Sequence, residues 1–365
     1  MQRRRVIQGL GLGVLAAASA ACSKEAGGPA AAADGRRFRW KLVTTWPPNF
    51  PALGTGALEF ARMVEACSGG RLTIKVYGAG ELVPAFEAFD AVASGTAEMA
   101  HGGAYYWKGK VGSASFFSAV PFGLTAQEMN AWLYFGGGLE LWQEAYAPFG
   151  VIPAPCGNSG CQMGGWFRKE IRSVADLAGL KMRSPGIGGE VLARAGGTPV
   201  TLSGGEIFTA LETGAIDATE WIGPYNDLAF GLHKAAKYYY YPGWHEPGTT
   251  LEALINRQAF EELPEDLREI VLACCRAIND RMLAEFTARN SEALATLVNE
   301  HGVELRRFPD DVLRRLKQLS VQVIQEGAAK DPLYQRVYES VSAFQARSSA
   351  YLAIAEDAYL RTRDL

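Results

Sequence analysis

The chain has 365 residues, of which 48% are hydrophobic and 21% are charged, and its formal net charge is -3. This length predicts one large or two ordinary globular domains. Acidic and basic residues nearly balance, which argues against a nucleic-acid partner because such proteins carry a strongly positive surface. The small net charge also means that an anionic ligand would have to be held by a local site and not by the field of the whole molecule.

Residues 1–36 are predicted to be an export signal followed by a linker. The basic residues Arg3 to Arg5 precede an apolar run from Val6 to Ala21, which is too short and too interrupted to indicate a membrane span. The paired arginines resemble a twin-arginine signal, and the small residues before Cys22 resemble a lipoprotein cleavage site. Two outcomes stay open, lipidation of Cys22 or cleavage without a lipid, so the mature protein is expected to be soluble or tethered.

Strands and helices alternate from Phe38 onward. The predicted elements are, in chain order, a strand over 38–46, a helix over 53–68, a strand over 71–78 and a helix starting near Val83. This order predicts a β-α-β unit with parallel strands. We assign residues 37–155 to a first lobe, completed by part of 245–300.

A second α/β unit is expected from about residue 150, and we assign it to residues 156–244, completed by part of 285–330. Two strands are predicted in 150–157 and 160–169, followed by helix–strand pairs. The segment 203–221 has a capped helix, a small-residue turn and a short strand, as 83–103 does. The sequence therefore predicts an α/β fold with two similar lobes.

The chain becomes helical after Pro264. One periodic run continues to Gly302 and, if unbroken, would be roughly 55–60 Å long, enough to bridge or brace both lobes. Two more helices are predicted over 310–330 and 331–365. The last has a long apolar face, which leaves two alternatives, packing on its own lobes or on a partner subunit.

The cysteines do not indicate a zinc site, because none has paired spacing with partner histidines. Export permits disulfides, and Cys156 and Cys161 are close enough in sequence to form one. The adjacent Cys274 and Cys275 lie in a helical run, where buried thiols are expected.

The motifs of an enzyme are incomplete. The glycines of "GIGG" at 186–189 lie between a predicted strand and helix, but Val191 breaks the dinucleotide-binding spacing. The Gly-x-Ser-x-Gly motif of hydrolases is absent, and no histidine stands as a partner for a nucleophile. Catalysis is therefore not expected.

Arg183 is the main candidate for binding a ligand. It ends a predicted strand and precedes a glycine-rich turn, and side chains at that end of an α/β strand point toward the crevice where ligands bind. A guanidinium there can hold a carboxylate by two parallel hydrogen bonds. The alternative is a solvated arginine at the end of a strand.

A second set of residues suggests a cation beside Arg183. Trp221 ends another strand of the same lobe, Gln162 begins a third, and Glu246 is a lone acid in an aromatic loop. Their oxygens, including a backbone carbonyl near Trp221, are the hard ligands that sodium or calcium would take. Gln162 could instead bond the backbone, and Glu246 could be an ordinary loop carboxylate.

The segment 177–227 resembles the solute-binding proteins of tripartite ATP-independent periplasmic (TRAP) transporters. The matching pattern is "DLAGLKMR" followed by "GGTPVTLSGGEIFTALETGAIDATE", and the likeness covers essentially all of 38–340. The stretches "QMGGWFRK", "EWIGPYND" and "YYYPGWHEPG" are similar to the branch that binds 2-oxo acids such as pyruvate, or lactate, with a metal cation.

The resemblance implies a two-lobe periplasmic binding protein with an interlobe cleft, a long bridging helix and a C-terminal helical extension that forms a dimer. It implies delivery of the ligand to membrane subunits of the transporter. It gives these roles to residues of this chain: Arg183 as carboxylate clamp, Gln162, Glu246 and the Trp221 carbonyl as cation ligands, Tyr106 and Asn158 as further substrate contacts, and Trp46 and Phe122 as walls. Another organic acid or a polyol as ligand, and more distantly an exported α/β enzyme, remain alternatives.

Overall fold

Parallel pairing of β1 (Phe38–Thr44) with β2 (Leu72–Tyr77) builds the start of the first sheet, with α1 (Leu53–Cys67) between them. The computed structural model describes residues 36–363 and 365. The predicted arginine motif, apolar run and Cys22 therefore lie outside the described residues. Within those residues the expected β-α-β unit is confirmed.

None of the described helices combines the length and the apolar composition that a membrane span requires.

The first sheet has five strands in the order β2-β1-β3-β10-β4. Its remaining strands are β3 (Met99–Gly102), β4 (Val151–Asn158) and β10 (Thr250–Asn256). β10 runs antiparallel to both of its neighbours, so the chain returns to this sheet after forming most of the second one. Besides α1, the helices next to these strands along the chain are α2 (Ala88–Ala93), α3 (Ala126–Phe135), α4 (Gly138–Tyr146) and α8 (Arg257–Glu261).

The second sheet has six short strands in the order β11-β9-β5-β8-β6-β7. These are β5 (Gly165–Phe167), β6 (Lys181–Arg183), β7 (Thr198–Val200), β8 (Ala218–Thr219), β9 (Tyr238–Tyr241) and β11 (Glu304–Arg307). Its helices are α5 (Gly186–Arg194), α6 (Gly204–Thr213) and α7 (Pro224–Phe230). Glu206 bonds back to Ser203 in the capping box that starts α6. The α/β class expected from the sequence is confirmed.

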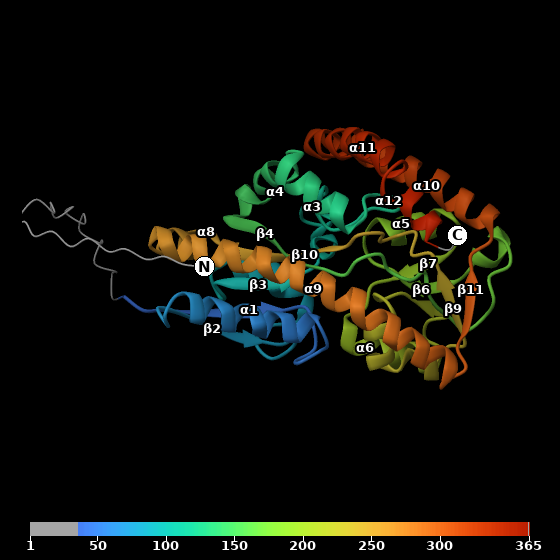
Figure 1. Cartoon of the computed structure of the whole chain (residues 1–365), viewed down its shortest axis with the longest axis horizontal. Helices are drawn as coiled ribbons and strands as arrows, with labels where there is room; N and C mark the ends of the chain where they lie inside the picture. Colours follow the sequence, from blue (N-terminus) through green and yellow to red (C-terminus); the bar gives the residue numbers. More distant parts are fainter. Residues whose placement is uncertain (1–35, 364) are drawn as a thin grey trace, which may run out of the picture. The chain divides into compact units, whose positions relative to one another are not determined.

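The predicted long helix is α9 (Glu265–Asn299), an unbroken helix of 35 residues. It starts directly after Pro264, and proline is common at helix N-termini because its missing N–H is not needed there. Figure 1 shows α9 running past both sheets, and it packs on α1 and β4 of the first sheet and on α7 of the second. Gly56 and Gly157 allow the close approach, because a Cβ atom at either position would lie less than 3 Å from Met282. One helix therefore packs on both sheets.

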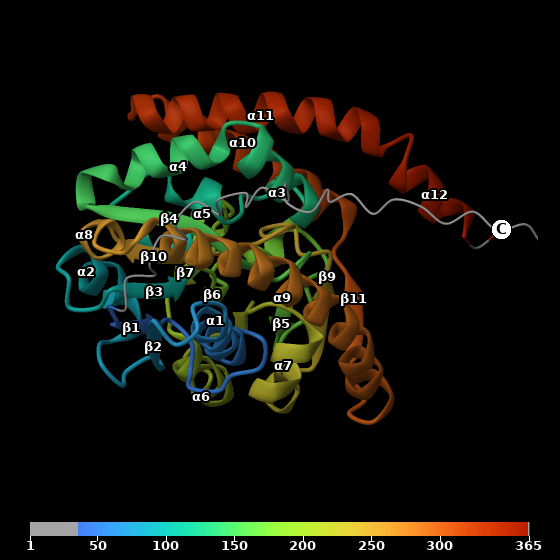
Figure 2. The same ribbon diagram turned by 60° about the vertical axis from the view of Figure 1, so that its left-hand side comes forward.

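The C-terminal segment differs from the single helix predicted over 331–365. It forms α11 (Pro332–Leu352) and α12 (Glu356–Thr362), separated by a turn, after α10 (Asp310–Ala328). α11 packs on α3, α4 and α10, and its buried side chains are Tyr334, Val337 and Val341. No side chain of α12 is buried. Tertiary packing therefore does not stabilise a continuation of α11 through to the end of the chain. Figure 2 shows α12 extending beyond α11.

A buried carboxyl lies in the middle of the first sheet. Glu252 of β10 is 0% exposed, and its two oxygens accept hydrogen bonds from Trp107 Nε1 and, at 3.0 Å, from Tyr146 Oη. Burial raises the pKa of Glu252 from 4.5 to about 8. The folded protein thus holds this proton more tightly than the unfolded chain does.

Substitution Glu252→Gln should flatten the pH dependence of stability. The stabilisation from the bound proton is complete below about pH 4.5 and is lost as the pH rises toward 8. Urea unfolding at pH 5 and pH 8 should show a smaller fall in the unfolding free energy for the variant, by on the order of 1–3 kcal/mol. Glu87→Gln, at an exposed position, is the control. Parallel pH profiles for wild type and Glu252→Gln would contradict the assignment.

Candidate functional site

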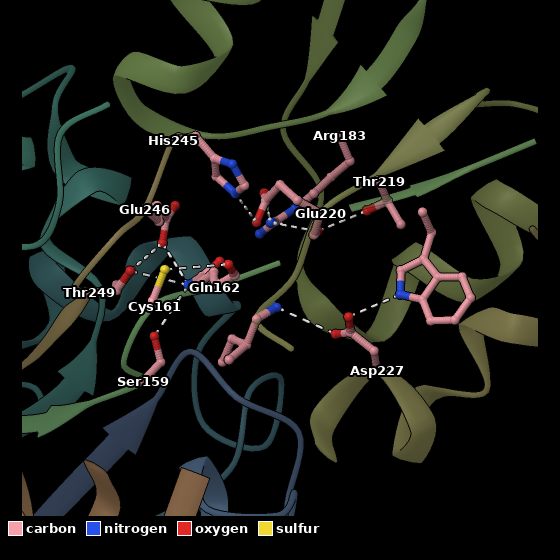
Figure 3. Close-up of polar contacts among 12 residues, drawn as sticks. Ser159, Cys161, Gln162, Arg183, Thr219, Glu220, Asp227, His245, Glu246 and Thr249 are labelled. Carbon is pink, nitrogen blue, oxygen red and sulfur yellow. Dashed lines mark hydrogen bonds and ion pairs between the residues drawn. The ribbon is translucent and has the colours of Figure 1, made fainter. Parts of the chain in front are cut away.

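Arg183 ends β6 and is buried, with 1% of its side chain exposed. Its guanidinium donates to the carbonyl oxygens of Leu202 (3.4 Å) and Glu220 (3.2 Å) and to Tyr106 Oη (3.2 Å). Figure 3 shows the side chain pointing toward the labelled polar residues and not outward. The alternative of a solvated arginine is therefore wrong.

Glu220 forms a buried ion pair with Arg183, and sequence reasoning did not single it out. Its Oε1 accepts from Arg183 Nη1, and both side chains are 1% exposed. The register of the sheet explains the contact, because Arg183 pairs with Thr219 across parallel strands and Glu220 follows directly. Burial alone would lower the pKa of Arg183, but the facing carboxylate raises it above its ordinary value.

The other carboxyl oxygen of Glu220 faces His245. Glu220 Oε2 lies 3.5 Å from His245 Nε2, and neither atom has a hydrogen-bond partner among the described residues. Buried polar atoms in native proteins are nearly always hydrogen-bonded. These two buried atoms therefore mark a place where the described residues leave hydrogen-bonding groups unsatisfied.

Gln162 and Glu246 form a second polar group beside this pair (Figure 3). Gln162 Nε2 donates to Glu246 Oε2 (2.8 Å), Thr249 Oγ1 (3.2 Å) and Ser159 Oγ (3.3 Å), and Thr249 Oγ1 also donates to Glu246 Oε2 (2.8 Å). Gln162 Oε1 is buried and accepts no hydrogen bond from the described part of the chain. Two connections between the sheets, 159–164 and 242–249, thus contribute one acidic, oxygen-rich cluster.

The cluster has the donor set of a cation site. One ligand atom from each of Glu220, His245 and Glu246 lies within 4.8 Å of the others, and all three residues are buried. Burial, and then the negative charge of Glu220, raises the pKa of Glu246 to about 7. A cation would relieve this repulsion and would satisfy Gln162 Oε1, so the residues fit an oxygen-preferring metal ion.

Aromatic side chains enclose the guanidinium. The Trp221 ring centroid lies 5.1 Å from Arg183 Cζ, within the range of a cation–π contact. Trp46 packs edge-on against Trp221 at 6.1 Å and donates from Nε1 to His101 Nδ1 at 2.7 Å. Phe122 packs on Trp244 instead, 5.9 Å between ring centroids. Of the predicted aromatic residues, Trp221 and Tyr106 thus contact Arg183, and Trp46 packs on both of them.

Asn158 ends β4 and is fully buried. Its Nδ2 donates to the Gly248 carbonyl and to Thr250 Oγ1, both at 3.3 Å, and its Oδ1 accepts from the Gly160 amide at 2.8 Å. These bonds hold the two connecting segments together next to Gln162. A direct contact between Asn158 and a ligand stays a prediction, as does the cation contact of the Trp221 carbonyl.

The glycine-rich turn has a packing role. Gly186 has a left-handed φ of 67°, and a Cβ atom on Gly189 would lie 2.2 Å from the Ser184 carbonyl oxygen. A Cβ atom on Gly188 would lie 3.1 Å from His245 Cβ. The small residues therefore let the start of α5 lie directly against the loop that holds His245 and Glu246.

The main polar residues of the site are shielded from solvent. Arg183, Glu220, Gln162 and Glu246 are at most 6% exposed. A ligand can contact them only when the segments around them separate. The arrangement suits capture by closure around a small anion, because expelling water strengthens charge–charge contacts.

Comparison with known proteins identifies relatives over nearly the whole chain. The family described as bacterial extracellular solute-binding protein, family 7, matches residues 42–331. A monocarboxylate 2-oxoacid-binding periplasmic protein of Nostoc sp. is 43% identical over 367 residues, covering 98% of each chain.

Solved structures of TRAP periplasmic solute-binding proteins share the fold. One from Pseudoalteromonas atlantica, with bound sodium and pyruvate, is 43% identical with a TM-score of 0.88 and covers 90% of this chain and 99% of its own. One from Colwellia psychrerythraea, with bound calcium and pyruvate, is 43% identical with a TM-score of 0.87, over 89% and 99%. One from Bordetella bronchiseptica is a dimer with calcium and picolinate, 38% identical with a TM-score of 0.88, over 89% and 97%.

Proposed function

This chain belongs to family 7 of the bacterial extracellular solute-binding proteins, and we propose that it captures a small 2-oxo monocarboxylate such as pyruvate, or lactate, together with a sodium or calcium ion. Family 7 consists of binding proteins, so the chain is a carrier and not an enzyme. The observation that carries the ligand proposal is the buried Arg183 beside an acidic cluster with unsatisfied oxygens. The relatives with bound pyruvate and a cation support the same ligand class.

The charges of the site explain why an anion and a cation would bind together. With Glu220 and Glu246 ionised, a ligand carboxylate would bring three negative charges around the single positive charge of Arg183. Burying such an excess of charge without compensation is strongly unfavourable. Calcium would cancel the excess, and sodium would cancel half of it. Gln162 Oε1, Glu220, Glu246 and the Trp221 carbonyl would hold the ion, while His245, a ligand type favoured by transition metals, would stay beside it.

The hydrogen bonds of Arg183 indicate how the ligand would bind. A guanidinium has five N–H donors. In Arg183 four of them donate, to the Leu202 carbonyl, to the Tyr106 hydroxyl, and to the backbone carbonyl and Oε1 of Glu220. With respect to the described residues, one donor, on Nη2, is left for an incoming carboxylate. Two-point binding through the two terminal nitrogens therefore requires the Glu220 carboxylate to leave Nη1. The bound cation would then supply the positive charge that Glu220 faces.

Substitution Arg183→Lys should weaken pyruvate binding by at least about 30-fold in isothermal titration calorimetry with sodium or calcium present. Lysine keeps the positive charge beside Glu220 but cannot form two parallel hydrogen bonds to a carboxylate. The control is Arg194→Lys, at an exposed arginine that pairs with Glu326. An unchanged dissociation constant for Arg183→Lys would refute the clamp.

Pyruvate binding should depend on the cation. After treatment with a chelator and dialysis into a sodium-free potassium buffer, we expect the affinity to fall at least about 10-fold, because the excess negative charge is no longer offset. Calorimetry after separate addition of sodium and calcium would identify the ion. Glu246→Gln should reduce the response to either ion, and full-strength binding without both ions would overturn the metal assignment.

The second candidate is a binding protein of the same family whose ligand is another organic acid or a polyol. A thermal-shift panel would separate these ligands, since the preferred one stabilises the protein most at a given concentration. A polyol that stabilises the chain more than any 2-oxo acid would replace the present proposal.

We propose that two chains associate through the C-terminal helices. The dimeric relative from Bordetella bronchiseptica supports this. Five exposed apolar side chains near the end of the chain also support it: Tyr351, Ile354, Tyr359, Leu360 and Leu365. A chain ending at Ser349 keeps the buried side chains of α11 and should sediment as a monomer while the full chain sediments as a dimer. A monomeric full chain, or a dimeric truncated one, would contradict this interface.

The remaining proposals concern organisation and location. The lobes would be 37–155 and 156–244, completed by parts of 245–300 and 285–330, and the ligand would be delivered to the membrane subunits of a TRAP transporter. Export would use the twin-arginine segment, with or without lipid at Cys22. Mass spectrometry of the mature N-terminus would decide between the two, since an unmodified residue downstream of Cys22 excludes lipidation.

A further inference from the structure

Two adjacent cysteines of α9 face thiols on two different elements. Successive residues of a helix point about 100° apart, and α9 packs on both α1 and β4. The Cys274 thiol lies close enough to that of Cys67, the last residue of α1, for the two to interact, and the Cys275 thiol interacts in the same way with that of Cys156 in β4. Cys156 therefore has Cys275 as its neighbouring thiol, whereas the sequence suggested Cys161.

The two thiol pairs differ in access to solvent. Cys67 is exposed, while Cys274 is 3% exposed. Cys156 and Cys275 are each 1% exposed, so an oxidant cannot reach either sulfur in the folded protein. Burial also raises the pKa of the Cys274 thiol to about 12, which leaves Cys67 as the thiol that an external reagent meets first.

We propose that Cys67 and Cys274 form a disulfide after export, and that Cys156 and Cys275 remain thiols. The family is extracellular, and disulfides form and persist in such compartments. This inference is independent of the ligand proposed above. The bond would close a loop of roughly 200 residues and would fix α9 to the first sheet, an arrangement that limits the freedom of the unfolded chain.

The reaction needs an oxidant, which we take to be a disulfide of another protein or of a small molecule. The Cys67 thiolate attacks that disulfide and forms a mixed disulfide, releasing one thiolate of the oxidant. The Cys274 thiol then loses its proton and attacks the Cys67 sulfur, releasing the second thiolate. Two electrons pass to the oxidant, which becomes a dithiol, and the protein loses two protons.

Peptide mapping of the full-length protein purified from the periplasm tests the pairing. Free thiols are alkylated in denaturant without reductant, and trypsin then yields a peptide of residues 63–71 and one of 269–276. We expect these two peptides to be linked, with one alkylated cysteine on the second. The link should persist in Cys275→Ala and disappear in Cys274→Ala. Unlinked peptides, or a link from 269–276 to the peptide that carries Cys156, would overturn the proposal.

Thermal unfolding gives a second readout. Dithiothreitol should lower the Tm of the wild-type protein by roughly 5 °C or more, because the loop constraint is lost. Cys67→Ser should have the low Tm with and without reductant, while Cys161→Ser should respond as the wild type does. A wild-type Tm that reductant leaves unchanged would contradict a stabilising disulfide at this position.

Discussion

The buried ion pair between Arg183 and Glu220 is the interaction around which the site is arranged. Removing two charges from water is costly, and each is tolerated only where the other and further hydrogen bonds compensate it. The structure meets this requirement with adjacent parallel strands, since β6 and β8 end side by side and place the two residues next to each other. The carbonyl oxygens of Leu202 and Glu220 and the Tyr106 hydroxyl accept three further hydrogen bonds from the guanidinium.

Beyond this pair, the connections between the two sheets supply the acidic and amide cluster beside it. The segment after β4 contributes Gln162, and the segment before β10 contributes His245, Glu246 and Thr249. Because these segments also connect the two sheets, any relative movement of the sheets would involve the same stretches of backbone that form the site. α9 packs on elements of both sheets and provides a continuous support behind them.

The sequence predicted the parts of this structure whose signals are local. Helical periodicity with Pro264 and Gly302 at its ends located α9, and a strand followed by a glycine-rich turn located Arg183. The position of Glu220 depends on strand register, and β8 has only two residues, too few to show which side chain faces inward. The turn between α11 and α12 contains no glycine or proline, so the sequence does not predict it. It occurs where the helix stops packing on the rest of the protein. The thiol pairs join elements far apart in sequence, so no spacing rule could find them.

The contact of Glu220 with the guanidinium has a consequence for selectivity. Glu220 behaves as a tethered competitor that already occupies Arg183 at a high effective concentration. A chloride ion or a simple fatty acid that offers nothing to the neighbouring oxygens would have to displace this competitor unaided. The ion pair would thus lower the affinity of the site for every carboxylate, and most of all for anions that cannot also contact the neighbouring oxygens.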